Sequence, residues 1–213
     1  MDFLPEELDN YVVAHSDQEP PLLYDLNRQT HLKVLQPRML SGHYQGRVLS
    51  MLSKMIQPKR VLEIGTYTGY SALCFAEGLQ SGGKITTIDV NHLLEEMVRN
   101  YIDKAGLNDT IEYIIGDAME IVPNLDEVFD LVFIDADKTN YVNYYNLVID
   151  KVPSGGYIIA DNVLWSGKVV QAIDSLDEDT KVLVEFNALV QADDRVENVL
   201  FPIRDGLMVI RKK

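Results

Sequence analysis

The chain has 213 residues, of which 46% are hydrophobic and 24% are charged, and its formal net charge is -14. This composition is typical of a soluble globular protein, and the length suits one α/β domain with a full core. The negative charge disfavours nucleic acid as the main partner, and no apolar run approaches the roughly 20 residues of a membrane span.

The start of the chain, MDFLPEELDN, is acidic where a signal peptide would be basic and then apolar. The single cysteine, Cys74, excludes an intrachain disulfide and lies in the apolar stretch SALCFAEGL, where we expect a core residue. Together these features predict a cytoplasmic protein without a membrane partner.

The first 56 residues have helical patterns interrupted by prolines 20, 21 and 37. The three patterns are PEELDNYVVAHS, LLYDLNRQTHLKV and GRVLSMLSKMI. We interpret residues 1–56 as helices on the rim of the core, forming a lid or a dimer contact. The chain 1–213 is then a single domain, with its α/β core in residues 57–213.

From residue 57 onward, apolar strand patterns alternate with helical ones. The strand patterns are KRVLEIG, KITTID, TIEYIIG, FDLVFID and YIIADN, and helices are expected from about Tyr70 and over Asn91 to Gly106. This alternation predicts a mostly parallel sheet with helices on both faces. At the C-terminus, VENVLFPI and GLMVIRK are joined through Arg204-Asp205-Gly206, which predicts an antiparallel hairpin.

The first strand ends in a glycine loop that indicates a nucleoside ligand. Gly65 and Gly69 give the spacing G-x-x-x-G, which departs from the G-x-G-x-x-G of dinucleotide sites. Asp89 ends the second strand, where an acidic residue can bind ribose hydroxyls. The carboxylate of Glu63 favours a cationic ligand. S-adenosylmethionine, with its sulfonium and ammonium groups, fits these features.

Residues whose side chains can bind a metal through oxygen stand at the ends of two later strands. Asp135 ends FDLVFID, and Asp161 and Asn162 end YIIADN. Two carboxylates and an amide suit a hard cation, with Mg²⁺ expected first and Mn²⁺ or Ca²⁺ also compatible, and they do not suit zinc.

Three stretches, LEIGTYTGYSAL, FDLVFIDADKTNY and YIIADNVLWSGKV, resemble in order and spacing the cation-dependent O-methyltransferases of the caffeoyl-CoA and catechol type. The resemblance covers the chain from about Met39 to the C-terminal hairpin. It implies a Rossmann-like class I methyltransferase fold with a mostly parallel seven-stranded sheet, and a homodimer with the N-terminal helices near the interface. It also implies methylation of a hydroxyl on a catechol-like or caffeoyl-like acceptor.

The resemblance implies a role for individual residues. Asp135, Asp161 and Asn162 would hold the metal, and Lys138, assisted by Asp135, would be the catalytic base. The residues expected to contact the cofactor are Leu40, Glu63, Gly65, Thr66, Gly69, Ser71, Asp89, Ala118, Asp135 and Asp137. Among these, Ser71 would bind the cofactor's carboxylate and Ala118 would lie by its adenine. The roles of His43, Tyr44 and Trp165 are left open.

Three alternatives differ in chemistry. A tRNA hydroxyuridine O-methyltransferase would use the same cofactor and metal, but the acidity of the chain argues against it. A non-catalytic, cofactor-binding dimeric module has no need for the metal ligands or the base. A nicotinamide dehydrogenase is disfavoured by the glycine spacing.

Overall fold

The computed structural model describes residues 5–213, which form two compact units, 5–117 and 118–213. Residues 1–4, the start of the predicted N-terminal helical segment, lie outside the described residues.

The unit 5–117 begins with the predicted helices. Its helices are α1 (Glu6–Ala14), α2 (Pro21–Lys33), η1 (Pro37–Met39), α3 (Gly42–Ile56), α4 (Tyr70–Ala76), η2 (His92–Leu94) and α5 (Glu95–Lys104). Pro21 begins α2, a position that proline tolerates because the amide of a first helical residue has no partner within the helix. Helix α3 begins four residues earlier than its predicted pattern, at Gly42.

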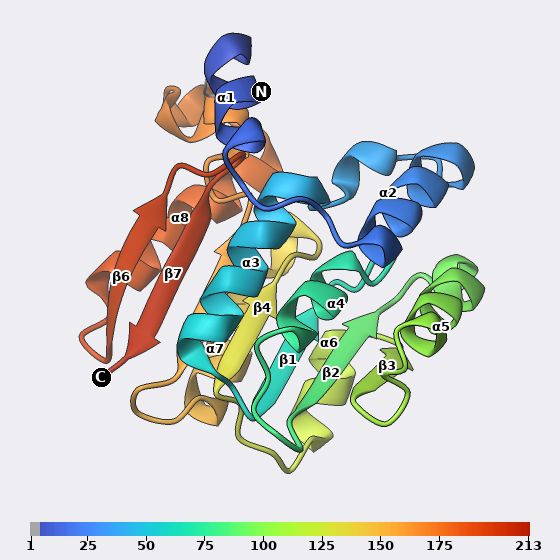
Figure 1. Cartoon of the computed structure of the whole chain (residues 1–213). Coiled ribbons are helices and arrows are strands. Elements are labelled where there is room, and N and C mark those ends of the chain that lie inside the picture. The colour runs from blue at the N-terminus through green and yellow to red at the C-terminus, as the bar shows by residue number, and fades with distance from the viewer. Residues whose placement is uncertain (1–4) are drawn as a thin grey trace. The chain divides into compact units, whose positions relative to one another are not determined.

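Three parallel strands form the core of this unit. They are β1 (Arg60–Ile64), β2 (Lys84–Asp89) and β3 (Ile111–Ile115), in the order β3-β2-β1. Most residues of β1 and β2 are buried, as expected for strands whose two faces are both covered. Helix α4 packs on β2 and α5 on β3 (Figure 1). The parallel register pairs Ile64 with Ile88 and Asp89 with Ile115, so the carboxyl ends of the strands meet at one edge.

The unit 118–213 contains the remaining four strands. Its elements are α6 (Ala118–Ile121), η3 (Val122–Asn124), β4 (Leu131–Ile134), η4 (Lys138–Asn140), α7 (Tyr141–Val148), η5 (Ile149–Lys151), β5 (Tyr157–Asp161), η6 (Trp165–Val170), η7 (Ile173–Ser175), α8 (Glu178–Ala192), β6 (Val196–Phe201) and β7 (Leu207–Lys212). The strand order is β4-β5-β7-β6. Strands β4 and β5 are parallel, whereas β7 is antiparallel to both of its neighbours. The mostly parallel α/β fold with a C-terminal hairpin is confirmed.

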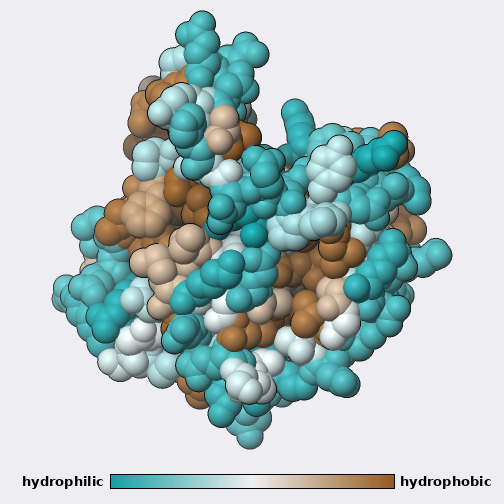
Figure 2. Space-filling view, in the orientation of Figure 1, coloured by the Kyte–Doolittle hydropathy of each residue, from teal (hydrophilic) through white to brown (hydrophobic). Residues whose placement is uncertain are grey.

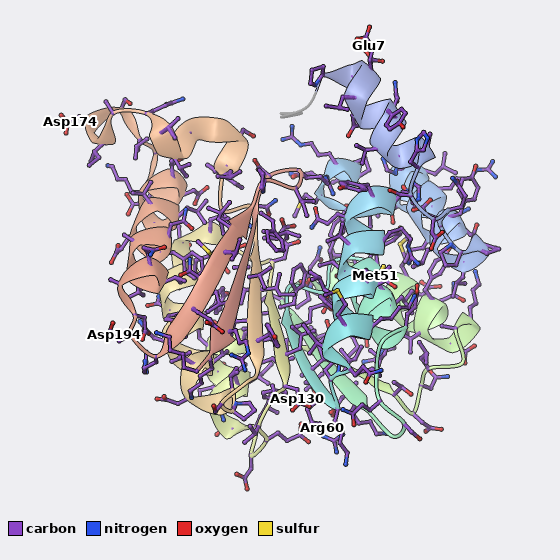
Figure 3. The ribbon with its side chains drawn as sticks, turned by 60° about the vertical axis from the view of Figure 1, so that its left-hand side comes forward. Glu7, Met51, Arg60, Asp130, Asp174 and Asp194 are labelled. Carbon is purple, nitrogen blue, oxygen red and sulfur yellow. The ribbon has the colours of Figure 1, made fainter. Side chains whose placement is uncertain are left out.

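Helix α8 covers this second group of strands, packing on α7 and β6. It begins after Asp177, whose carboxylate accepts a hydrogen bond from the Thr180 amide at 2.9 Å. The acidic run that precedes α8 therefore supplies the cap of the helix, and Asp174 lies in that run, at the outer end of the loop (Figure 3). Phe186 of α8 packs edge-on against Tyr141 and Tyr145, with ring centroids 5.5 and 6.1 Å apart.

The face of the molecule seen in Figure 2 is mainly hydrophilic, with apolar groups reaching it in several places. Met51 points outward from α3 (Figure 3), and Met55 on the same helix is 73% exposed. Cys74 is buried, as expected, and burial raises the pKa of its thiol. Within residues 5–213, no helix combines the length and apolar character needed to cross a membrane.

A polar cluster joins α3 to the end of α4. Arg47 donates to both carboxylate oxygens of Glu77, at 2.7 and 3.0 Å, and the side chains of Ser50 and Lys54 donate to the same carboxylate at 2.7 and 3.0 Å. Burial raises the pKa of Glu77, but the hydrogen bonds from Arg47, Ser50 and Lys54 outweigh it and lower that pKa to about 2. Glu77 therefore keeps its negative charge in acid as long as the protein is folded.

We expect Glu77→Gln to lower the free energy of unfolding at pH 6 by about 1–2 kcal/mol, after allowance for solvent screening of this partly exposed group. The pKa of Glu77 in the folded state lies below its ordinary value of about 4.5. Its contribution to the free energy of unfolding is therefore complete above pH 4.5 and is lost as the pH falls towards 2. Urea unfolding of the unchanged protein and of Glu77→Gln, at pH 6 and at pH 3, measures this contribution. The difference between them should shrink at pH 3; an equal difference at both pH values would contradict this assignment.

Candidate functional site

The loop after β1 is shaped by its glycines. Gly65 and Gly69 have φ values of 102° and 85°, a region that residues with a Cβ atom rarely adopt. The amide of Gly65 donates to the carbonyl of Ile88 at 2.9 Å, which fixes the loop to the end of β2. The sequence predicted this loop, and the structure shows a turn whose backbone can approach a ligand closely.

Asp89 holds the same loop from the end of β2. Its carboxylate accepts hydrogen bonds from the amides of Tyr67 at 2.7 Å and Asn91 at 2.8 Å. The Tyr67 bond explains how a non-glycine residue keeps a φ of 50° in this turn. A carboxylate accepts about four hydrogen bonds, so Asp89 retains acceptor capacity for ligand hydroxyls.

Glu63 is the fourth of the five residues of β1, and its side chain is fully buried. The hydroxyl of Thr87 donates to its carboxylate at 2.5 Å, and the Thr66 and Thr87 hydroxyls are 2.6 Å apart. The residue therefore belongs to a buried network of hydroxyl groups. Its carboxyl group lies in a low-dielectric interior, where a charge acts strongly on its surroundings.

Two further predicted cofactor residues of this unit are also buried. Ser71 lies in the first turn of α4 and is 6% exposed, and Leu40, which precedes α3, is 4% exposed. His43 bonds through its ring Nε2 to the carbonyl of Asp17 at 2.6 Å. This contact gives His43 a structural partner in the segment between α1 and α2.

In the unit 118–213, the ends of β4 and β5 bring the predicted metal ligands to one edge. The last registered pair is Ile134 with Ala160, so Asp135 and Asp161 follow side by side on adjacent parallel strands. Neighbouring strands are about 4.8 Å apart. Asp161 is 3% exposed and its carboxylate accepts the amide hydrogen of Asn162 at 2.7 Å.

Lys138 lies at the same edge and is 9% exposed. Its Nζ donates to the carboxylate of Asp135 at 3.2 Å, to the carbonyl of Ala136 at 2.9 Å and to the hydroxyl of Tyr141 at 2.7 Å. These three acceptors match the three donors of an ammonium group. The lysine predicted as the base is thus held in one orientation beside a predicted metal ligand.

Tyr141 connects the lysine to the second strand. Its hydroxyl accepts from Lys138 and donates to the main-chain carbonyl of Asp161 at 2.8 Å. Burial raises its pKa well above the ordinary value, and the charges of Asp135 and Asp161 raise it further, so the hydroxyl keeps its proton. From the sequence, Tyr141 is expected to be a packing residue, and the structure adds the hydrogen bonds of its hydroxyl. Its spacing of three residues from Lys138, one helical turn, is the signal that predicts their contact.

Asp137 fixes the loop that carries the lysine. Its carboxylate accepts from the Tyr144 hydroxyl at 2.5 Å and from the side chains of Asn140 and Thr139 at 2.6 and 3.1 Å. Burial raises the pKa of Asp137, but these hydrogen bonds outweigh that effect and lower it. Its contacts in the structure are therefore with the residues that follow it in η4 and α7. Ala118, the predicted adenine contact, is buried at the start of α6.

The donor set at this edge suits a hard cation. Residues 5–213 contain no group of three His, Cys, Asp or Glu side chains placed to hold a metal. The candidate ligands at this edge are the carboxylates of Asp135 and Asp161, on adjacent strands, and the side-chain amide of Asn162, so all of them offer oxygen atoms. Asn162 has a φ of 61°, a left-handed conformation that asparagine tolerates better than most residues. The residues present therefore fit Mg²⁺ or Mn²⁺.

Trp165 follows in the next loop. The Nζ atoms of Lys138 and Lys168 lie 5.9 and 6.0 Å from the centre of its ring. This places an aromatic ring next to the lysine.

Comparisons with known proteins identify the family of this chain. A family model described as O-methyltransferase matches residues 13–213. A caffeoyl-CoA O-methyltransferase of Petroselinum crispum is 36% identical over 206 residues, which cover 92% of this chain and 85% of the relative. Among solved structures, a Podospora anserina methyltransferase with bound SAH has a TM-score of 0.89 and 28% identity, covering 100% of this chain and 99% of that one. An O-methyltransferase of Bacillus cereus in complex with SAH has a TM-score of 0.89 and 29% identity, covering 97% of each chain. The chain therefore belongs to the O-methyltransferase family.

Proposed function

We propose that the protein transfers a methyl group from S-adenosylmethionine to one hydroxyl of a small phenolic acceptor with two adjacent hydroxyls, with the help of a divalent cation. The observation that carries this proposal is the hydrogen-bonded chain Asp135, Lys138, Tyr141 and Asp161 at the ends of β4 and β5. It places a candidate base beside carboxylates that suit a cation.

The methyl donor is assigned to the glycine loop and Asp89. The Gly65 and Gly69 backbone accommodates the donor, and Asp89 has acceptor capacity for its ribose hydroxyls. The buried charge of Glu63 favours the positive sulfonium and ammonium groups. The relatives with SAH bound support this assignment.

The acceptor is assigned to the edge formed by β4 and β5. A cation held by Asp135, Asp161 and Asn162, which we propose to be Mg²⁺, would supply positive charge that favours ionisation of the acceptor hydroxyl. Lys138 in its neutral amine form takes the hydroxyl proton, and Asp135 and Tyr141 accept hydrogen bonds from the ammonium group that results. The acceptor oxygen then attacks the methyl carbon in line, while the bond from that carbon to the sulfonium sulfur breaks. The names of the plant relatives support a caffeoyl-like acceptor.

The same family resemblance supports a homodimer in which the N-terminal helices lie at the interface. Helix α3 presents Met51 and Met55 to solvent, 54% and 73% exposed, and a second copy would bury them.

The proposal is tested by methyl transfer to caffeoyl-CoA, to catechol and to the matched monophenols, each with and without EDTA. We expect product only from acceptors with two adjacent hydroxyls, and only when a divalent cation is present. Turnover that survives chelation, or equal turnover of monophenols, would remove the cation and the diol from the mechanism.

A further inference from the structure

The loop Asn162–Gly167, which follows β5, has an unusual backbone. Asn162, Trp165 and Ser166 have φ values of 61°, 45° and 55°, and Gly167 has 76°. The left-handed region is unfavourable for residues that carry a Cβ atom, so three of them within five positions need support from elsewhere.

The turn before β7 provides contacts to this loop. Strand β7 is antiparallel to β5, and Asp161 pairs with Leu207, so the residues just before β7 lie beside the residues just after β5. The carbonyls of Asp205 and Gly206 accept from the amides of Leu164 and Val163, at 2.9 and 3.3 Å.

The side chain of Asp205 adds the contact on which this inference depends. Its carboxylate Oδ1 accepts from the amide of Ser166 at 2.5 Å, in the middle of the left-handed stretch. Asp205 thus binds the loop at two points, through its carbonyl and its carboxylate.

Gly206 allows the turn to come this close. A Cβ atom at this position would lie 2.6 Å from Cγ of Leu164, and the φ of Gly206 is 92°. Both the space and the conformation therefore require glycine. On its other side, the loop is held by Asn187 of α8, whose side chain donates to the carbonyl of Val163 at 2.9 Å.

We propose that Asp205 is a positioning residue, which holds the loop Asn162–Gly167 so that Asn162 and Trp165 face the end of β5 in one fixed arrangement. The consequence for catalysis rests on the proposed function, in which Asn162 is a cation ligand. Residues that orient a ligand from behind typically contribute about 10–100-fold to metal affinity or activity.

The chain offers a direct reporter for this proposal, because Trp165 is its single tryptophan. Acrylamide quenching and anisotropy of Trp165 fluorescence report the order of the loop alone. They are measured without the methyl donor, the methyl acceptor or the cation. Asp205→Ala removes the hydrogen-bond acceptor of the Ser166 amide, whereas Asp205→Asn keeps an oxygen in the same place. Asp126→Ala changes an exposed aspartate elsewhere and is the matched control. If Asp205→Ala does not fold, Asp205→Glu, which displaces the carboxylate by one methylene, replaces it.

We expect Asp205→Ala to increase the quenching constant about twofold and to lower the anisotropy, while Asp205→Asn and Asp126→Ala remain close to the unchanged protein. Mn²⁺ affinity should fall about 10-fold for Asp205→Ala only, a value at the lower end for a group that supports a ligand. Unchanged quenching in Asp205→Ala, or equal changes in Asp205→Asn, would overturn the proposal. A wild-type enzyme that is active in EDTA would instead defeat the proposed function and leave the fluorescence result standing.

Discussion

Lys138→Met is expected to lower kcat by about 10³-fold, within the 10²–10⁴-fold range of general acid–base catalysis. Methionine preserves the length and the apolar stem of the side chain but cannot accept a proton. The lysine is buried, and its amine is held by Asp135, Ala136 and Tyr141. The measurement is the rate of methyl transfer at saturating donor and acceptor.

Lys138→Arg separates proton transfer from simple charge. Arginine keeps the positive charge but stays protonated at any pH at which proteins fold. We expect this variant to be as slow as Lys138→Met, with calorimetric affinity for S-adenosylhomocysteine within about twofold of wild type, as expected if only the proton-transfer step is lost. An active Lys138→Arg enzyme would show that the lysine acts through its charge and not as a base.

Asp161→Asn is expected to raise the concentration of Mg²⁺ or Mn²⁺ needed for half-maximal activity by about 10²-fold. Asparagine keeps an oxygen to accept the amide hydrogen of Asn162 but removes one negative charge from the proposed cation site. The main-chain carbonyl that accepts from Tyr141 is unchanged by this substitution. The measurement is initial rate against cation concentration in chelator-buffered solutions.

The control for this substitution is Asp126→Ala, which removes a negative charge from an exposed position. It should leave the cation dependence unchanged. If Asp126→Ala and Asp161→Asn shift the dependence equally, the effect comes from the net charge of the protein and not from a ligand.

Much of the fold could be predicted because its signals are local. The apolar runs that became β1, β2, β4 and β5, and the Asp205-Gly206 turn of the hairpin, are read from short windows of sequence. The placement of Asp135 beside Asp161 follows from the rule that parallel strands end at one edge, and the register confirms it.

The contacts that connect distant segments could not be predicted in this way. The bond from Thr87 to Glu63 depends on the register of two strands, and the bond from Ser166 to Asp205 depends on an antiparallel pairing and on left-handed residues. Neither leaves a periodic pattern in the sequence. The hydrogen bonds that Asp137 accepts from Tyr144 and Asn140 also depend on side-chain conformation, and its contact with the cofactor stays a prediction.

The central claim is that Asp135, Asp161 and Asn162 bind one divalent cation, and the most direct test is an anomalous diffraction map of crystals grown with Mn²⁺. We predict one strong peak per chain, within about 2.0–2.3 Å of an oxygen of each of these three side chains, the range of metal–oxygen bonds for small divalent ions. A map without a peak at the ends of β4 and β5, or with the manganese bound by other residues, would contradict the account.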